Sequence, residues 1–166
     1  MLNEIRRKPE DGRRGGAWVL AQIPLLLLTF ALPAVLPAAV LPWPAGTHPW
    51  REYLGLALGA SGLLLAGLGL IRLGPNLTPL PRPKEGGALV TTGVYGLVRH
   101  PIYGGIVLLA FGSALRAATW LVVPLALLVL LFFSRKAALE ERWLTEKFAD
   151  YEAYRRRTAR LIPWIY

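Results

Sequence analysis

Long uncharged stretches of the chain alternate with shorter charged segments, and this alternation is the strongest pattern in the sequence. Four uncharged stretches separate one charged residue from the next: Gly15–Trp50, Tyr53–Ile71, Pro101–Leu115 and Ala117–Ser134. About 20 apolar residues in an α-helix cross the roughly 30 Å hydrocarbon core of a bilayer. The first stretch holds one span and a Pro-rich loop, and the second and fourth hold one span each. The pattern therefore predicts an all-α integral membrane protein with about four transmembrane helices.

The third stretch is the shortest. Its 15 residues give about 22 Å of helix at about 1.5 Å per residue. Such a helix either dips part-way into the bilayer or uses flanking residues to reach the interface. Arg116 lies in a tight connection between the third and fourth stretches, which predicts that these two helices form a hairpin.

We expect a single membrane domain of five consecutive parts. Span one runs from about Ala17 to about Leu41, and span two from about Tyr53 to Leu73. The first apolar region is far longer than the core of a cleavable signal peptide, so we expect span one to be retained. The parts are a cytoplasmic arm (1–16), spans one and two (17–73), a cytoplasmic loop (74–100), the helical hairpin (101–134) and a C-terminal helix and tail (135–166).

The basic residues predict the orientation in the membrane. Of the 19 Lys and Arg residues, five precede the first span, four lie in the loop from Arg72 to Arg99, and eight lie from Arg135 onward. Only Arg51 and Arg116 fall on the other side. Because positive loops are retained in the cytoplasm, both termini and the middle loop are expected there.

Composition excludes several other classes of function. The net charge of +9 is explained by this topology and by attraction to anionic lipids, so we do not expect a nucleic-acid partner. Cysteine is absent, which excludes disulfides, thiol catalysis and Cys-ligated metal. His48 and His100 lie on opposite sides of the predicted membrane and cannot share a metal, so no metal site is expected. Composition leaves the oligomeric state open.

The segment around Pro101 has features of an anion-binding site. Proline suits the first position of a helix because its missing amide hydrogen would be unpaired there. The amides and the positive dipole end of this helix would point toward the cytoplasmic interface. Arg99 and His100 lie at this helix start, and Gly104-Gly105 permits close approach of a backbone or a ligand.

The tail from Arg135 to Arg160 has the pattern of an amphipathic helix. At 100° per residue, one face collects Ala137, Leu144, Phe148 and Tyr151. Glu140 and Glu141 flank that face, so two neighbouring carboxylates project just beyond the expected membrane exit of span four. For Phe148, Tyr151 and Tyr154, packing is the preferred interpretation.

Together these segments resemble the isoprenylcysteine carboxyl methyltransferase and phospholipid methyltransferase superfamily of integral-membrane enzymes. The family has an Arg-His-Pro box at a helix start and a Glu-Glu pair beyond a helical hairpin. This chain has Arg99-His100-Pro101-Ile102-Tyr103-Gly104, followed after the hairpin by Glu140-Glu141. The lead-in Gly93-Val94-Tyr95 and a tail that closes on Arg160-Leu161-Ile162-Pro163 are also similar. The resemblance covers roughly Leu89 to Pro163.

The resemblance implies that S-adenosylmethionine binds between the cytoplasmic ends of spans three and four and the C-terminal helix. It implies Glu140 and Arg99 as catalytic residues. The acceptor would be lipophilic and would enter from the lipid side. The residues implied in cofactor binding are Tyr95, Val98, His100, Pro101, Tyr103, Gly104, Glu140 and Glu141.

Other interpretations of the same residues stay open. Arg99 can serve only as a positive-inside anchor, and the Glu pair can be a solvated patch beside Arg135 or Lys136. The acceptor can be a prenylcysteine carboxylate, a phospholipid amine or a small thiol, since the motif residues bind the shared cofactor. The chain can also be a non-catalytic membrane scaffold that keeps the hairpin for assembly.

Overall fold

The fold is entirely helical over the residues that the structure describes. The computed structural model describes residues 11–36, 40–81, 86–163 and 165 of the chain. Residues 1–10 of the expected arm and Pro83 of the loop lie outside these ranges. In chain order the elements are α1 (Asp11–Val35), α2 (His48–Leu73), η1 (Gly74–Asn76), η2 (Gly93–Gly96), α3 (Pro101–Arg116), η3 (Trp120–Val122), α4 (Val123–Lys147) and α5 (Tyr151–Arg155), where η denotes a 3₁₀-helix.

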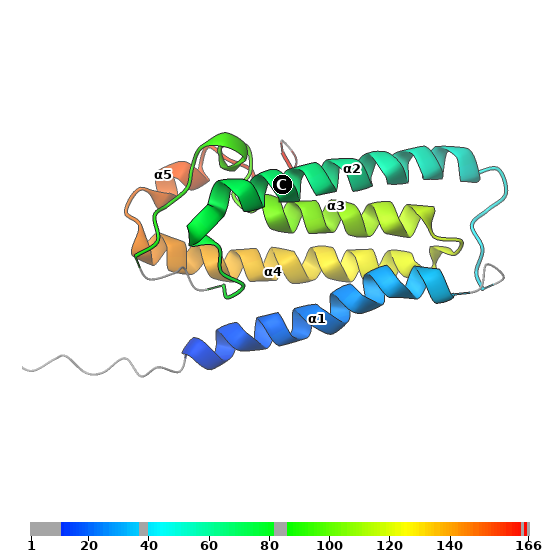
Figure 1. The fold of residues 1–166 in the computed structure, drawn as a ribbon, viewed down its shortest axis with the longest axis horizontal. Helices are drawn as coiled ribbons and strands as arrows, with labels where there is room; N and C mark the ends of the chain where they lie inside the picture. The colour runs from blue at the N-terminus through cyan, green and yellow to red at the C-terminus, as the bar shows by residue number, and fades with distance from the viewer. Residues whose placement is uncertain (1–10, 37–39, 82–85, 164, 166) are drawn as a thin grey trace, which may run out of the picture.

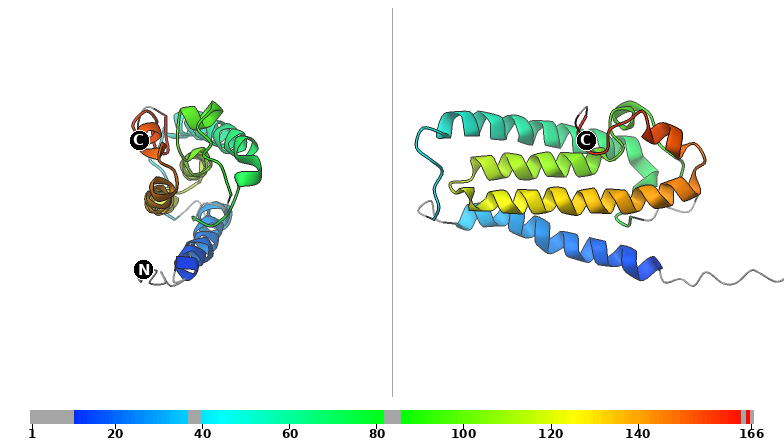
Figure 2. Two further views of the ribbon diagram at one scale, coloured as in Figure 1. Left: turned by 90° about the vertical axis from the view of Figure 1, so that its left-hand side faces the viewer. Right: turned by 180° about the vertical axis from the view of Figure 1, so that it is seen from behind.

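Helices α2, α3 and α4 lie side by side along the long axis of the molecule (Figures 1 and 2). Helix α1 crosses this group at an angle, and its N-terminal half diverges from α4 in both side views. The start of α1, the loop between α2 and α3, and α5 all lie at one end of the bundle. We call this end, where α3 begins and α4 finishes, the motif end.

Within the part of the chain that the structure describes, three helical stretches are long and apolar enough to cross a membrane. They are Gly15–Val35, His48–Asn76 and Trp120–Lys147. Helix α3 is apolar but has only 16 residues, as the short third stretch of the sequence led us to expect. The described residues thus form an all-helical membrane-type bundle, and a full crossing by α3 stays a prediction.

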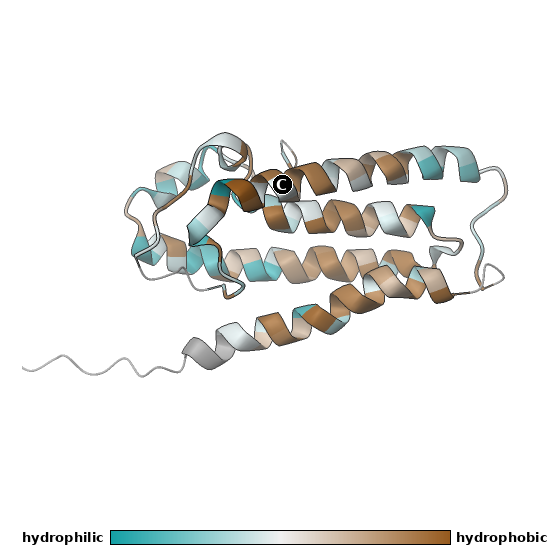
Figure 3. Cartoon of the chain, in the orientation of Figure 1, coloured by the Kyte–Doolittle hydropathy of each residue, from teal (hydrophilic) through white to brown (hydrophobic). Residues whose placement is uncertain are grey.

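Apolar side chains face outward along the helices, as expected of a lipid-exposed surface. Figure 3 shows hydrophobic colour along the middle of α1, α2, α3 and α4 and hydrophilic colour at both ends of the bundle. Lipid rather than water is the natural environment of such an exposed apolar surface. Exposed examples from three helices are Leu20, Leu27, Leu63, Leu64, Leu127 and Leu131.

Helices α2 and α3 pack through a seam of glycines. A Cβ built at Gly62 would lie 2.6 Å from the Gly105 carbonyl oxygen, and one at Gly112 would lie 2.7 Å from the Gly55 carbonyl oxygen. Such contacts are tighter than side chains allow, so the two backbones touch directly. Small residues drive close helix association in membranes because packing replaces the hydrophobic effect there.

Arg51 closes the opposite end of the bundle. It is 7 % exposed, and its guanidinium donates to the carbonyl oxygens of Leu115 and Ala117 at 2.5 and 3.3 Å. These carbonyls lie at the end of α3, where the helix offers them no amide donor and a cation complements the helix dipole; the Ala117 carbonyl also accepts from Trp43 Nε1 at 3.1 Å. The guanidinium carbon lies 4.6 Å from the centre of the Trp43 ring, so Trp43 packs against Arg51 in a cation–π contact.

The helix boundaries differ from the expected ones at three places. Helix α1 runs from Asp11 to Val35 rather than from about Ala17 to about Leu41. Helix α2 begins at His48 rather than near Tyr53, with Pro49 in its first turn. Helix α4 continues without a break past Ser134 to Lys147, so residues 135–147 are not the separate amphipathic helix that we expected. The charges there mark the end of the apolar segment but not of the helix, because Arg, Lys, Glu, Ala and Leu are all good helix formers. Among the described residues beyond Phe148, the short α5 is the only helix.

We expect Gly62→Ala to destabilise the bundle, because the new methyl group would press on the backbone of α3. Overpacking of this kind costs about 1–3 kcal/mol. Gly67→Ala is the matched control, since a Cβ at this position of the same helix meets no atom within 4 Å. Thermal unfolding in detergent micelles measures both variants. Equal unfolding midpoints would contradict the direct contact of α2 with α3.

Candidate functional site

The backbone just before α3 pairs with the C-terminal tail. The Arg99 amide donates to the Ala159 carbonyl at 2.9 Å, and the His100 amide donates to the Arg160 carbonyl at 3.0 Å. Val98 forms a parallel bridge with Ala159 and has no exposed surface. The tail therefore fixes the backbone from which the Arg-His-Pro box presents its side chains.

Helix α3 begins as its sequence predicts. Pro101 occupies the first helical turn directly after His100, and the Gly104 amide donates to the His100 carbonyl at 2.9 Å. Gly104 makes a close backbone approach possible, because a Cβ there would overlap the Leu161 carbonyl oxygen. The group that approaches Gly104 is thus the tail of the same chain.

Glu141 is the centre of a buried ion cluster. It is 3 % exposed, and its carboxylate pairs with Arg99 Nε at 2.8 Å and with an Arg160 guanidinium nitrogen at 3.1 Å. Arg99 also donates to the carbonyl oxygens of Arg155, at 2.9 Å, and Thr158. One carboxylate on α4 thereby holds both the start of α3 and the tail.

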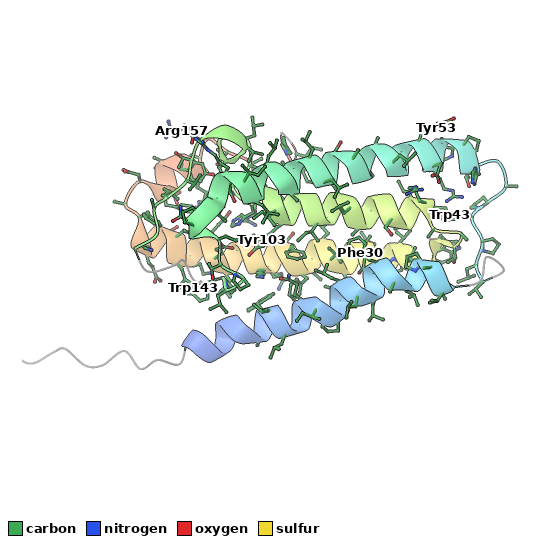
Figure 4. All side chains as sticks on the ribbon, in the orientation of Figure 1. Phe30, Trp43, Tyr53, Tyr103, Trp143 and Arg157 are labelled. Atoms are coloured by element: carbon green, nitrogen blue, oxygen red, sulfur yellow. The ribbon has the colours of Figure 1, made fainter. Side chains whose placement is uncertain are left out.

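The Glu140 side chain points away from the Glu141 cluster, toward Tyr103 and His100. The Tyr103 hydroxyl donates to Glu140 Oε2 at 3.0 Å, and His100 Nδ1 lies 3.7 Å from the same oxygen. The Tyr103 ring is stacked on His100 with the ring centres 5.4 Å apart. Figure 4 shows Tyr103 in the interior, between α3 and α4. The Glu140 side chain is 22 % exposed and is therefore reachable by a ligand.

A cleft of about 930 Å³, its open mouth included, lies beside Glu140 at the motif end. Its walls come from the end of α2, η1 and the loop that follows, residues 87–90, the start of α3, the end of α4, and α5. The hydroxyl of Tyr151, one of its lining residues, is buried without a hydrogen-bond partner among the described residues, whereas the buried His100 Nε2 lies 3.4 Å from Glu141 Oε1. Unsatisfied buried polar atoms are rare in folded proteins, so the Tyr151 hydroxyl directs attention to this cleft.

Three tyrosines form part of the cleft wall: Tyr95 from η2, and Tyr151 and Tyr154 from α5. The Tyr154 hydroxyl donates to the Tyr95 carbonyl at 2.6 Å, and the Tyr95 hydroxyl donates to the Gly69 carbonyl at 3.4 Å. Burial raises the pKa of Tyr154 to about 12 and raises the pKa of Tyr151 further. Both phenols therefore stay protonated and remain hydrogen-bond donors over the physiological pH range.

The structure divides the expected site residues into two groups. Five of them line the cleft: Tyr95, Arg99, His100, Tyr103 and Glu140. The other four are absent from its lining and pack behind its wall: Val98, Pro101, Gly104 and Glu141. Lining the cleft is a matter of position, so a role of any of these residues in binding stays a proposal.

Several residues of the site were not expected from the sequence. Arg160 completes the ion cluster, and Asn76, Thr78 and Lys147 line the cleft. Tyr151 and Tyr154, which we assigned to packing, are buried and also line the cleft. The length of the 74–100 loop was the only sequence signal for its share of the lining, because long loops in compact domains are often functional.

We expect Glu141→Gln to destabilise the motif end, because two guanidinium groups would lose their shared counter-ion. Breaking a buried ion pair by removing one partner costs about 3–5 kcal/mol. Glu146→Gln on an exposed site of the same helix is the control. Thermal unfolding, with tryptic cleavage at Arg155–Arg157 as a local probe, measures the effect. Unchanged cleavage and stability in Glu141→Gln would refute the clamping role of the cluster.

Comparison with known proteins places these features in a family. The family model described as phospholipid methyltransferase matches residues 50–151. The chain is 30 % identical over 122 residues to protein-S-isoprenylcysteine O-methyltransferase B of Arabidopsis thaliana. The aligned region covers 71 % of this chain and 62 % of the plant protein. It is 30 % identical over 146 residues to a probable protein-S-isoprenylcysteine O-methyltransferase of Oryza sativa subsp. indica, covering 85 % of this chain and 76 % of that protein.

The name of a bacterial relative gives methanethiol as the methyl acceptor, in contrast to the isoprenylcysteine in the names of the plant relatives. Methanethiol S-methyltransferase 1 of Bradyrhizobium diazoefficiens is 36 % identical over 93 residues, covering 55 % of this chain and 30 % of that protein. The family-model match covers more than half of the chain and includes both the Arg-His-Pro box and the Glu pair. The chain therefore belongs to the isoprenylcysteine carboxyl methyltransferase and phospholipid methyltransferase superfamily.

Proposed function

We propose that this protein is an integral-membrane methyltransferase that moves a methyl group from S-adenosylmethionine to a lipophilic acceptor at the cytoplasmic face of the membrane. The observation that carries the proposal is the convergence of His100, Tyr103 and Glu140 on the wall of one cleft. These residues come from the two motifs shared with the family. The names of the plant relatives, which are O-methyltransferases, support the reaction class.

The chemistry of the cleft fits S-adenosylmethionine. This cofactor supplies a methyl group that a sulfonium makes electrophilic. Glu140 Oε2 is held by Tyr103, while no hydrogen bond to Glu140 Oε1 comes from the described residues, so this oxygen can accept from a ribose hydroxyl or an ammonium group. The aromatic rings of Tyr95, Tyr103 and Phe148 in the lining suit a sulfonium through cation–π attraction.

The protein residues would act by binding, orienting and excluding water. Methyl transfer needs an in-line approach of the acceptor, so positioning supplies most of the rate. We assign Glu140 and His100 to direct contact with the cofactor. Arg99 is 8 % exposed and already bonded to Glu141 and to two carbonyl groups. We therefore assign to it a positioning role, in place of the catalytic role that the resemblance implied.

The orientation rests on the distribution of charge. The motif end carries the loop before α3, which ends at Arg99, and α5 with the tail after it, where four Arg residues lie between positions 155 and 160. The opposite end carries Arg51 and Arg116. The charge-bias rule then places the cleft on the cytoplasmic side. An acceptor dissolved in the membrane would reach the cleft from the lipid between helices.

Three acceptor classes fit this reaction. A prenylcysteine-type carboxylate is a nucleophile as it stands and needs only orientation. A phospholipid amine must first lose a proton, for which Glu140 is the base at hand. A small thiol is the third class, and the name of the Bradyrhizobium relative is in line with it.

We expect the folded protein to bind S-adenosylmethionine and Glu140→Gln or His100→Ala to weaken this binding at least several-fold. The glutamine loses the charge that attracts the cofactor's cationic groups, and hydrogen bonds to charged groups contribute about 1.5–3 kcal/mol. Titration calorimetry on detergent-solubilised protein measures the affinities, with the exposed Glu146→Gln as control.

The outcome separates the enzyme from the scaffold alternative. Absence of binding by protein with a normal unfolding transition would rule out the cofactor site and leave assembly as the role of the hairpin. Equal weakening in Glu146→Gln would show that the cofactor site lies elsewhere.

A further inference from the structure

The hydroxyl of Tyr151 is a buried polar group that the fold leaves without a partner. Tyr151 is 1 % exposed and lines the cleft at the motif end. No residue that the structure describes forms a hydrogen bond with its hydroxyl. Buried tyrosine hydroxyls usually have a hydrogen-bond partner, so this one marks a point of the cleft where a ligand can supply the partner.

The neighbouring Tyr154 shows the usual arrangement. Its ring meets that of Tyr151 edge-on, with the ring centres 5.7 Å apart, and its hydroxyl donates to the Tyr95 carbonyl at 2.6 Å. The fold therefore uses both the ring and the hydroxyl of Tyr154. From Tyr151 it uses the ring, which a phenylalanine would replace without burying an unpaired polar group.

The missing partner of Tyr151 is a hydrogen-bond acceptor. Burial raises the pKa of Tyr151 well above its usual value, and the Glu141 carboxylate raises it further. The phenol therefore keeps its proton and can donate it to a ligand. Because hydrogen bonds are stronger when one partner is ionised, a carboxylate on the ligand is the most favourable acceptor.

A cation lines the cleft close in the chain to Tyr151. Lys147 is the last residue of α4, and Tyr151 is the first residue of α5. Both residues line the cleft. The Lys147 ammonium lies 5.1 Å from the centre of the Phe148 ring, which belongs to the same lining. The part of the cleft where α4 ends thus has a positive charge as well as an unused donor.

Helix α4 carries the opposite charge farther along the same cleft. Glu140, Leu144 and Lys147 all line it, since positions i, i+4 and i+7 share one face of a helix. Seven residues correspond to about 10 Å along the helix axis. The cleft is therefore negative at Glu140 and positive at Lys147.

This order of charges matches the methionine part of S-adenosylmethionine, which has a cationic sulfonium and, as its one anionic group, a carboxylate. We propose that the Tyr151 hydroxyl donates a hydrogen bond to this carboxylate and that Lys147 supplies positive charge beside it. The inference rests on the proposed function and deepens it, because it assigns the end of the cofactor that lies against α5. Tyr151 would then be a specificity residue, selecting ligands that carry the carboxylate.

A matched pair of cofactors tests this assignment: S-adenosylmethionine and its decarboxylated form, which lacks only the carboxylate. Titration calorimetry on the full chain in detergent micelles gives both dissociation constants. The native protein should bind S-adenosylmethionine about tenfold tighter or more, as for hydrogen bonds to a charged group. In Tyr151→Phe the affinity for S-adenosylmethionine should fall about fivefold or more, while that for the decarboxylated form stays within about twofold of native.

Two further variants separate the charge from the hydroxyl. Lys147→Met should also lower the preference for S-adenosylmethionine, and its effect should shrink at high ionic strength, because Lys147 is exposed and exposed charges are screened by salt. Arg142→Gln removes an exposed cation of α4 that does not line the cleft. Tyr53→Phe removes the hydroxyl of an exposed tyrosine of α2. Both of these controls should keep the native preference.

Thermal unfolding without cofactor distinguishes a ligand-binding hydroxyl from a structural one. Tyr151→Phe should unfold at the native temperature or above, since no internal hydrogen bond is lost. A lower unfolding temperature would reveal an internal partner and overturn the inference.

The binding data overturn the inference if native protein binds both cofactor forms equally, or if Tyr151→Phe keeps the native preference. Either result leaves the proposed function standing, because S-adenosylmethionine is still bound. Failure of folded native protein to bind S-adenosylmethionine refutes the proposed function itself.

Discussion

The pairing of Glu141 with Arg99 and Arg160 is the interaction on which the motif end depends. These charges join three parts of the chain that no helix connects directly: the end of α4, the start of α3 and the C-terminal tail. The backbone pairing of residues 97–100 with the tail and the close approach of Leu161 to Gly104 depend on the same alignment. Because buried charges tolerate little loss of geometry, the cluster holds the walls of the cleft in a fixed relation. A cleft that must position two reactants benefits from such rigidity.

The two adjacent glutamates have different surroundings because successive positions on a helix point about 100° apart. Glu141 is enclosed by guanidinium groups, whereas Glu140 reaches the cleft beside Tyr103 and His100. Glu141 stabilises the fold of the motif end, and Glu140 faces the cleft. The Arg-His-Pro box is divided in the same way, since Pro101 begins the helix while the imidazole of His100 lines the cleft. Each motif thus joins a structural residue to one that lines the cleft.

Features with a local signal were predictable from the sequence, and features that depend on distant contacts were not. Pro101 marks the start of α3 by its missing amide hydrogen, and the short loop at Arg116 gave the α3–α4 hairpin. We expected a helix to end at Ser134 because charged residues follow it, but α4 continues to Lys147. The charges mark the end of the apolar segment and not the end of the helix. Arg160 and Lys136 resemble ordinary surface cations in the sequence. Their partners, Glu141 and Gln22, are 19 and 114 positions away, which no local pattern encodes.

Transfer of a labelled methyl group tests the central claim most directly. Membranes that contain the native protein, or its Glu140→Gln variant at equal abundance, are supplied with methyl-labelled S-adenosylmethionine, and label is followed into the extracted lipid. The account predicts label in lipid with the native protein and a loss of about tenfold or more with the variant, as expected when a charged contact is removed. Equal labelling of the two membranes, or none above membranes without the protein, would contradict it.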